Sequence, residues 1–231
     1  MSRVHGEPKD DEVAVADIAA NVTTVQERIA GAARRAGCDP ASITLVAAAK
    51  TTSSEQVRAV IEAGVVDIGE NRAQELLAKA PVLADGPVPP RWHFIGSLQR
   101  NKVKALSSWV SLWQSVDREP LGAEIARHAP GAHVLVEVNL DGEPTKAGCA
   151  PDDTAHLVDA FAAHGLVVDG LMAVPPAANE PRPWFALLAE LGARVGVRDL
   201  SMGMTQDFEV AIEEGATIVR VGRALFGARP A

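Results

Sequence analysis

Lys50 is the residue whose position in this sequence most clearly suggests chemistry. It follows the apolar segment 43–49, and an apolar segment of this length predicts a buried strand. A lysine at the end of a buried strand loses hydration, and desolvation disfavours its charged form. We therefore expect an amine that is uncharged often enough to attack an aldehyde and form a Schiff base. The other five lysines stand in polar sequence surroundings. The alternative interpretation is that Lys50 only marks where the strand meets water.

The elements that would position Lys50 alternate between strand-like and helix-like segments. Short apolar segments predict strands at 43–49, 66–69, 92–95, 110–116, 133–139, 166–173, 197–201 and 217–221. Helical spacing predicts helices at 54–63, 71–80, 98–107, 119–129, 152–164, 182–194 and 206–214. Apolar residues at three- and four-residue steps over 15–32 predict an extra N-terminal helix. This order predicts an α/β protein with a single (β/α)8 TIM barrel, and a doubly wound open sheet is the alternative.

Polar residues and glycines follow several predicted strands, and a barrel would gather them at the carboxyl ends of its strands. Asn71 follows the second strand, Ser201 and Gly203 follow the seventh, and Gly222 and Arg223 follow the eighth. In such barrels the loops after strands seven and eight frequently bind phosphate. Glycine lets the backbone approach an anion, and free N–H groups at a helix start attract it. Each glycine alone is more commonly a turn residue, but their joint position favours a phosphate site.

A lysine that condenses with aldehydes beside a phosphate site fits two kinds of protein. One binds pyridoxal 5′-phosphate, and the other is a Schiff-base aldolase that acts on a phosphorylated sugar. Residue spacing alone does not separate them.

The composition argues against several classes of protein. The chain has 231 residues and a formal net charge of −8, which disfavours nucleic-acid binding. Two cysteines, no apolar secretory segment and no stretch of about 18 apolar residues predict a cytoplasmic protein without membrane contact. The six histidines show no metal-ligand spacing, so we expect no metal site. We expect residues 1–11 to form a disordered tail and 12–231 a single domain.

Several segments, in this order along the chain, resemble one protein family. They are 45–51 (LVAAAKT), 68–75 (IGENRAQE), 92–102 (WHFIGSLQRNK), 115–118 (SVDR), 138–148 (VNLDGEPTKAG), 170–175 (GLMAVP) and 200–227 (LSMGMTQDFEVAIEEGATIVRVGRALFG). The chain resembles the pyridoxal phosphate homeostasis proteins, which are related to the N-terminal barrel domain of alanine racemase. This resemblance covers nearly the whole chain from residue 43 onward.

The resemblance implies a (β/α)8 barrel that carries pyridoxal 5′-phosphate as a Schiff base on Lys50. The implied cofactor-binding residues are Lys50, Asn71, Met172, Ser201, Gly203, Arg220, Gly222 and Arg223. Among them, Ser201, the two glycines and the backbone of Arg223 would contact the phosphate, and Met172 would pack near the ring. Arg220 would face the pyridine nitrogen, and an arginine there would weaken the ring as an electron sink because it does not readily give up its proton.

Three positions depart from the pattern of the resembled family. Ala49 stands where a serine is common, Thr52 where a second lysine is common, and Arg223 where a small residue is common. Lys146 matches a family lysine that the resemblance links to a secondary cofactor site. The departure at Arg223 bears on the detailed phosphate contacts.

The resemblance implies a non-catalytic protein that stores or carries pyridoxal phosphate and delivers it to apo-enzymes, and we expect a monomer. Racemization needs an acid or base on each face of the α-carbon, and this chain contains no tyrosine to supply the second one found in alanine racemase. The alternative is a weak pyridoxal phosphate-dependent racemase or lyase, in which Lys50 would also act as the base.

Overall fold

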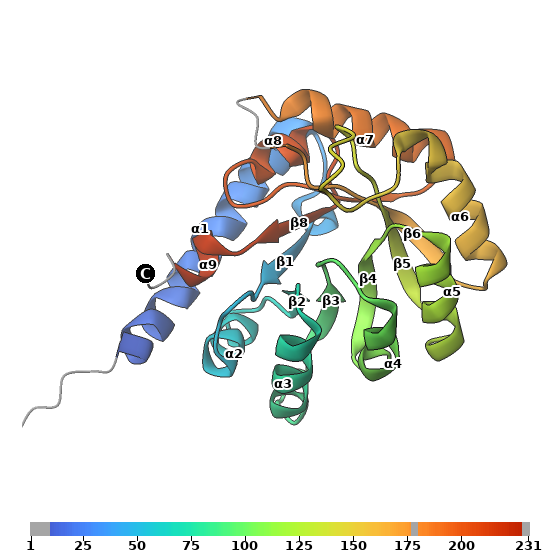
Figure 1. Ribbon diagram of the computed structural model, residues 1–231. Helices are drawn as coiled ribbons and strands as arrows, with labels where there is room; N and C mark the ends of the chain where they lie inside the picture. The colour runs from blue at the N-terminus through green and yellow to red at the C-terminus, as the bar shows by residue number, and fades with distance from the viewer. Residues whose placement is uncertain (1–9, 177–179, 228–231) are drawn as a thin grey trace, which may run out of the picture.

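Eight parallel strands close into one barrel in sequence order, with β8 pairing back onto β1 (Figure 1). The computed structural model describes residues 10–176 and 180–227. The strands are β1 (Thr44–Ala48), β2 (Asp67–Glu70), β3 (Arg91–Phe94), β4 (Val110–Val116), β5 (His133–Glu137), β6 (Val167–Met172), β7 (Asp199–Ser201) and β8 (Ile218–Val221). The predicted (β/α)8 TIM barrel is therefore confirmed, and the open sheet is excluded.

Helices surround the barrel and return the chain from the end of one strand to the start of the next (Figure 1). They are α1 (Asp10–Ala36), α2 (Ser54–Glu62), α3 (Ala73–Ala84), α4 (Val103–Leu106), α5 (Glu119–His128), α6 (Thr154–Ala163), α7 (Arg182–Val195), α8 (Phe208–Glu213) and α9 (Arg223–Phe226). Short 3-10 turns η1 (Pro40–Ser42), η2 (Arg100–Lys102) and η3 (Pro151–Asp153) precede β1, α4 and α6. A capping box between Ser53 and Gln56 fixes the start of α2, next to the end of β1.

The N-terminal helix α1 packs across α2, α8 and α9 on the outside of the barrel (Figure 1). Its apolar stripe is buried at Ile18, Val22, Val25, Ile29 and Ala32, as the spacing predicts. The structure describes the backbone of Val15 but not its side chain. α1 begins at Asp10, within the segment 1–11 that was predicted to form a disordered tail, and residues 1–9 are not described.

Polar side chains continue from the floor of the barrel to its mouth. A small apolar cluster of Val46, Leu135, Met172 and Ile218 fills part of the interior. Beside it lie buried polar residues from six different strands, namely Asp67, His93, Gln114, Glu137, Ser201 and Arg220. Because residues on a strand alternate in direction, this polar set comes from the lumen-facing positions, while the larger apolar core lies between strands and helices.

Three helices differ clearly from the sequence prediction. α3 continues through Pro81 to Ala84, beyond its predicted end at residue 80, because Leu83 beyond the proline still packs into the core. The predicted helix 98–107 forms only the 3-10 turn η2 and the four-residue helix α4. The short helix α9 follows β8 and was not predicted, since four residues are too few for helical periodicity to show. Among the described residues, no helix combines the length and the apolar character needed to span a bilayer.

Candidate functional site

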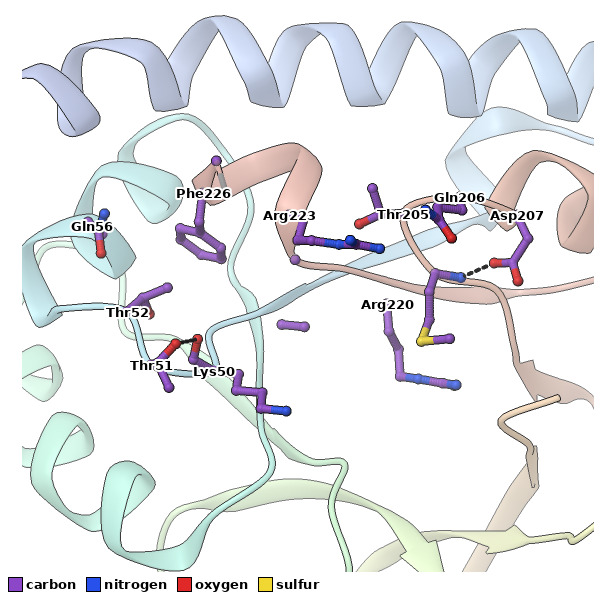
Figure 2. Close-up of a pocket in the computed structure, with 14 residues that line it drawn as sticks. Lys50, Thr51, Thr52, Gln56, Thr205, Gln206, Asp207, Arg220, Arg223 and Phe226 are labelled. Atoms are coloured by element: carbon purple, nitrogen blue, oxygen red, sulfur yellow. Dashed lines mark hydrogen bonds between the residues drawn. The ribbon is translucent and has the colours of Figure 1, made fainter. Parts of the chain in front are cut away.

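A cavity of about 320 Å³ lies at the carboxyl ends of β1 and β8, next to the loop after β7. Its lining comes from three stretches of chain, within 48–56, 204–207 and 220–227. Lys50 and Arg220 extend into this space from different sides, and Arg223 and Phe226 reach it from α9 (Figure 2). The barrel therefore brings Lys50 and Arg220, which come from the ends of different strands, together in one cavity.

Lys50 lies two residues beyond β1, and its side chain is exposed. The premise that burial removes its amine from water is therefore wrong, because the chain turns away from the buried strand before Lys50. The turn depends on Thr51, whose φ of 63° is in the left-handed region. A β-branched residue seldom adopts that conformation unless its surroundings impose it. The structure thus presents Lys50 to the cavity from a constrained turn.

Among the lysines that the structure describes, the buried one is Lys79 on α3, not Lys50. Its Nζ lies 2.5 Å from Glu70 Oε1 and 2.8 Å from the backbone oxygen of Ala49. The prediction that all lysines other than Lys50 stand in polar surroundings is wrong for Lys79, whose relative exposure is 7%. Burial raises the pKa of Glu70 to about 7, while the hydrogen bond and charge of Lys79 oppose the rise.

Arg220 is buried beneath the cavity and fixed by two hydrogen bonds. Its Nη1 donates to Ser201 Oγ at 2.6 Å, and its Nη2 donates to the backbone oxygen of Ala173 at 2.9 Å. Burial lowers the pKa of Arg220 to about 10, against the charges of Glu137 and Asp207. Even so lowered, the guanidinium stays protonated at neutral pH and presents a fixed positive charge to the cavity.

A chain of hydrogen bonds runs from Arg220 through the lumen to the floor of the barrel. The Ser201 hydroxyl donates to Gln114 Oε1 at 2.6 Å, and Gln114 Nε2 lies 2.7 Å from His93 Nδ1. His93 Nε2 lies 3.0 Å from Asp67 Oδ1. If the Gln114 amide donates, His93 carries its proton on Nε2 and donates to Asp67. The Ser201 hydroxyl therefore donates to Gln114 and accepts from Arg220 in this structure. Its expected contact with a phosphate stays a prediction.

Four of the predicted site residues line the cavity, and four lie outside its lining. Lys50, Arg220, Gly222 and Arg223 line it. Ser201 and Met172 are neighbours in the barrel below it, where Met172 packs in the apolar lumen cluster. Gly203 and Asn71 lie beside it at the ends of β7 and β2.

The two loop glycines are required for different reasons. Gly203 has a φ of 88°, and a Cβ there would lie 2.6 Å from the Cβ of Ala211. Only a glycine fits that backbone and that close approach to α8. A Cβ on Gly222 would lie 3.2 Å from the backbone oxygen of Ala48, which is tight but less severe. Both glycines thus let β7 and β8 turn into the walls of the cavity.

Asn71 has an amide oxygen, Oδ1, that is buried and finds no hydrogen-bond partner among the described residues. Its backbone is held closely, because a Cβ on Gly96 would lie 2.3 Å from the backbone oxygen of Asn71. A buried amide without a partner is uncommon in a native structure. The Asn71 amide oxygen is therefore an unused hydrogen-bond acceptor at the end of β2.

The chain matches known proteins over most of its length. Residues 13–230 match the family described as "Alanine racemase, N-terminal domain". The chain is also 42% identical over 222 residues to the pyridoxal phosphate homeostasis protein of Pseudomonas aeruginosa, which covers 92% of this chain and 96% of that protein. The chain belongs to the pyridoxal phosphate homeostasis protein family.

Two further comparisons support this assignment. The Aquifex aeolicus protein of that description is 43% identical over 222 residues, covering 90% of this chain and 96% of the relative. The structure of PipY from Synechococcus elongatus, solved with pyridoxal phosphate (PLP) bound, superimposes with a TM-score of 0.76 at 31% identity. It covers 88% of this chain and all of PipY. The predicted family resemblance is confirmed.

Sequence reasoning missed two charged groups near the cavity. Glu137 ends β5 and is 9% exposed, and its Oε2 has no hydrogen-bond partner among the described residues. Burial raises the pKa of Glu137 to about 7, with the charge of Asp117 adding to the rise and those of Arg220 and Arg118 opposing it. A charged residue that closes an apolar strand was a signal available in the sequence. Asp207 lines the cavity, and its Oδ1 accepts from the Met204 amide at 2.6 Å (Figure 2).

Proposed function

We propose that this chain binds pyridoxal 5′-phosphate and takes part in its intracellular homeostasis as a storage or carrier protein without robust turnover. Lys50 holds the cofactor covalently as a Schiff base. The observation that carries the proposal is that Lys50 shares one cavity with Arg220, Arg223 and the glycine turn after β8. The names of the relatives and the bound cofactor in PipY support it.

The charge and size of the cavity fit a small phosphorylated molecule. Three cationic side chains line it, those of Lys50, Arg220 and Arg223, against the single carboxylate of Asp207. That carboxylate is turned toward its own loop, because it accepts the Met204 amide. A volume of about 320 Å³ is at the lower end of the range for small-molecule pockets, roughly 300–1,000 Å³. The surplus positive charge favours an anion.

Backbone groups supply donors for the phosphate. Within the described residues, the N–H groups of Thr205, Gln206 and Arg223 make no hydrogen bond. All three residues line the cavity. Unpaired N–H groups in two facing loops are suited to bind an anion, and glycine at 222 lets the backbone come close to it. In this assignment the Ser201 hydroxyl supports Arg220, and the loop amides bind the phosphate.

The exposure of Lys50 suits a carrier. When bound, the cofactor supplies an aldehyde carbon that joins the amine nitrogen with release of water. Lys50 must first lose a proton to act as a nucleophile, and its exposure lets solvent accept that proton. The same exposure leaves the linkage within reach of an incoming amine, so the cofactor is released as well as held.

Several features of the cavity argue against efficient amino-acid turnover. Arg220 stays protonated at neutral pH, so it can donate a hydrogen bond to a ring nitrogen but does not protonate it. The described part of the lining contains no histidine and no cysteine, and the chain has no tyrosine. Proton transfer on both faces of an α-carbon requires two such groups. Asn71 and Met172 complete the site beside and below the cavity.

We further propose that the protein acts as a monomer in the cytoplasm and delivers the cofactor to apo-enzymes. One barrel provides every described residue of the cavity lining, so a second subunit is not needed to complete it. Its two cysteines are free thiols, which suits a reducing compartment. Light scattering during gel filtration tests the monomer. Loss of bound cofactor to an added apo-enzyme, faster than spontaneous release, tests delivery.

Reduction with borohydride followed by peptide mass spectrometry tests the central claim. The protein is loaded with pyridoxal 5′-phosphate, and we expect a pyridoxyl label on Lys50 and a Schiff-base absorbance band that Lys50→Ala abolishes. Lys104→Ala serves as the control, because Lys104 is an exposed lysine away from the cavity. A label on another lysine, or none, would reject the proposal. Exchange of amino-acid α-protons in deuterated water at enzyme-like rates would favour the racemase or lyase alternative.

A further inference from the structure

Lys79 is buried directly behind the turn that carries Lys50. Its side chain is 9% exposed, and that of its partner Glu70 is fully buried. The ammonium group contacts Glu70 Oε1 at 2.5 Å, the Ala49 oxygen at 2.8 Å and Glu75 Oε2 at 3.6 Å. The first two contacts are hydrogen bonds, and the third is a longer ion pair. These contacts hold the Lys79 side chain away from the cavity, whose lining does not include it.

Lys79 and Glu75 hydrogen-bond to the backbone on both sides of Lys50. On the N-terminal side, the Ala49 carbonyl accepts from Lys79, and the Ala49 amide donates to the Gly69 oxygen at 2.9 Å. On the C-terminal side, the Thr51 amide donates to Glu75 Oε2 at 3.0 Å. Glu75 also forms an ion pair with Lys79. The Lys79 ammonium therefore contacts the Ala49 carbonyl directly and the Thr51 amide through Glu75.

These hydrogen bonds explain the left-handed backbone conformation of Thr51. A left-handed φ of 63° at a β-branched residue is unfavourable and persists only when other contacts impose it. The bond from the Thr51 amide to Glu75 fixes that amide, and the bond from Lys79 fixes the carbonyl of Ala49. Since Lys50 lies between these two anchors, their positions set the direction in which its side chain leaves the end of β1.

We propose that Lys79, with Glu70 and Glu75, is a positioning cluster that aims Lys50 into the cavity. The inference rests on the proposed function for one of its readouts, the reaction of Lys50 with the cofactor aldehyde. A lysine held near the attack geometry reacts faster than one that must find it, and a displacement of about 1 Å can cost about 100-fold in rate. Lys79 acts through the backbone and does not touch the cofactor.

The test compares the rate of covalent loading of Lys50 between variants of equal folded fraction. Lys79→Met/Glu70→Gln removes both buried charges, so neither is left without a partner. We expect loading to slow by about 10- to 100-fold, measured by stopped reduction and mass spectrometry. Lys104→Met is the matched surface control and should load at the wild-type rate. Loading of the folded double variant within twofold of the wild type would overturn the proposal.

Glu75→Ala provides a second, milder variant in case the double variant does not fold. Its side chain is 21% exposed, so the substitution removes the anchor of Thr51 without opening the core. We expect slower loading, and Glu75→Gln should restore part of the rate because its amide oxygen can still accept from Thr51. A folded Glu75→Ala protein with unchanged loading would likewise refute the inference.

Hydrogen exchange at the Thr51 amide separates this inference from the proposed function. It is measured on protein without cofactor, and exchange at this amide should accelerate at least about tenfold in the double variant and in Glu75→Ala. A wild-type protein that takes no label on Lys50 would reject the proposed function, and the exchange result would still decide the positioning cluster. Unchanged exchange in both variants would overturn the cluster even where Lys50 is labelled.

Discussion

Replacing Glu137 by glutamine should change how stability depends on pH. Burial raises the pKa of this carboxyl to about 7 from an ordinary value of 4.5. Between those values the folded protein binds more protons at this site than the unfolded chain does. Stability therefore falls as pH rises through the window from about 4.5 to 7, because the carboxyl must ionise in a place that disfavours the charge.

The size of the effect follows from linkage between proton binding and folding. With pKa values of 4.5 unfolded and about 7 folded, the destabilisation is about 0.8 kcal/mol at pH 5 and about 3.3 kcal/mol at pH 8. The glutamine variant does not ionise, so the wild type should lose about 2.5 kcal/mol relative to Glu137→Gln over that range. Glu70 also titrates near 7, but it is present in both proteins and its contribution cancels.

Urea unfolding of the cofactor-free protein at pH 5, 6, 7 and 8 measures this difference. The comparison of slopes does not depend on how well the amide itself fits, because any fixed cost of the substitution is the same at each pH. The exposed residue Glu62 provides the control substitution Glu62→Gln. A difference between Glu137→Gln and wild type that stays constant from pH 5 to 8 would show that burial does not raise this pKa.

Two other substitutions test the lumen hydrogen-bond chain and the cavity charge. Gln114→Leu removes the partners of the Ser201 hydroxyl and of His93 Nδ1, so we expect a loss of about 2–6 kcal/mol in unfolding free energy from two buried polar groups. If urea titration shows that Gln114→Leu lowers the unfolding free energy by less than about 1 kcal/mol, these two buried hydrogen bonds do not contribute as expected. Arg223→Ala should weaken pyridoxal phosphate binding about fivefold at low salt, with the gap narrowing in 1 M salt as charges are screened. Titration that finds equal affinity at both salt concentrations would exclude a charge contact with the phosphate.

The sequence was sufficient to predict the barrel because each strand is a short apolar segment bounded by turn residues. The predicted strand 110–116 matches β4 in both bounds, and the others differ by a few residues at their ends. Lys50, Gly222 and Arg223 could be placed near one another because the strand ends of a barrel converge. Arg220 was assigned a role only through the family resemblance, because it lies inside the predicted strand 217–221.

The environment of each side chain was not predictable in the same way. Lys50 follows a buried strand and yet is exposed, because the left-handed turn at Thr51 carries it out of the barrel wall. Lys79 stands on a helix and yet is buried, because Glu70 and the Ala49 carbonyl lie opposite it across the fold. These contacts join residues 9 and 30 positions apart. The spacing of residues along a single helix or strand does not predict contacts of this kind.

The helix α1 has a consequence for the rigidity of the barrel mouth. A barrel made from one chain has a seam where its first and last strands meet, and here the cavity lies at that seam, between β1 and β8. α1 spans this seam, because it packs against α2 on the β1 side and is hydrogen-bonded on the β8 side to α9 through Asn21 and to α8 through Arg28. A segment outside the eightfold pattern thus keeps the two halves of the cavity from spreading apart.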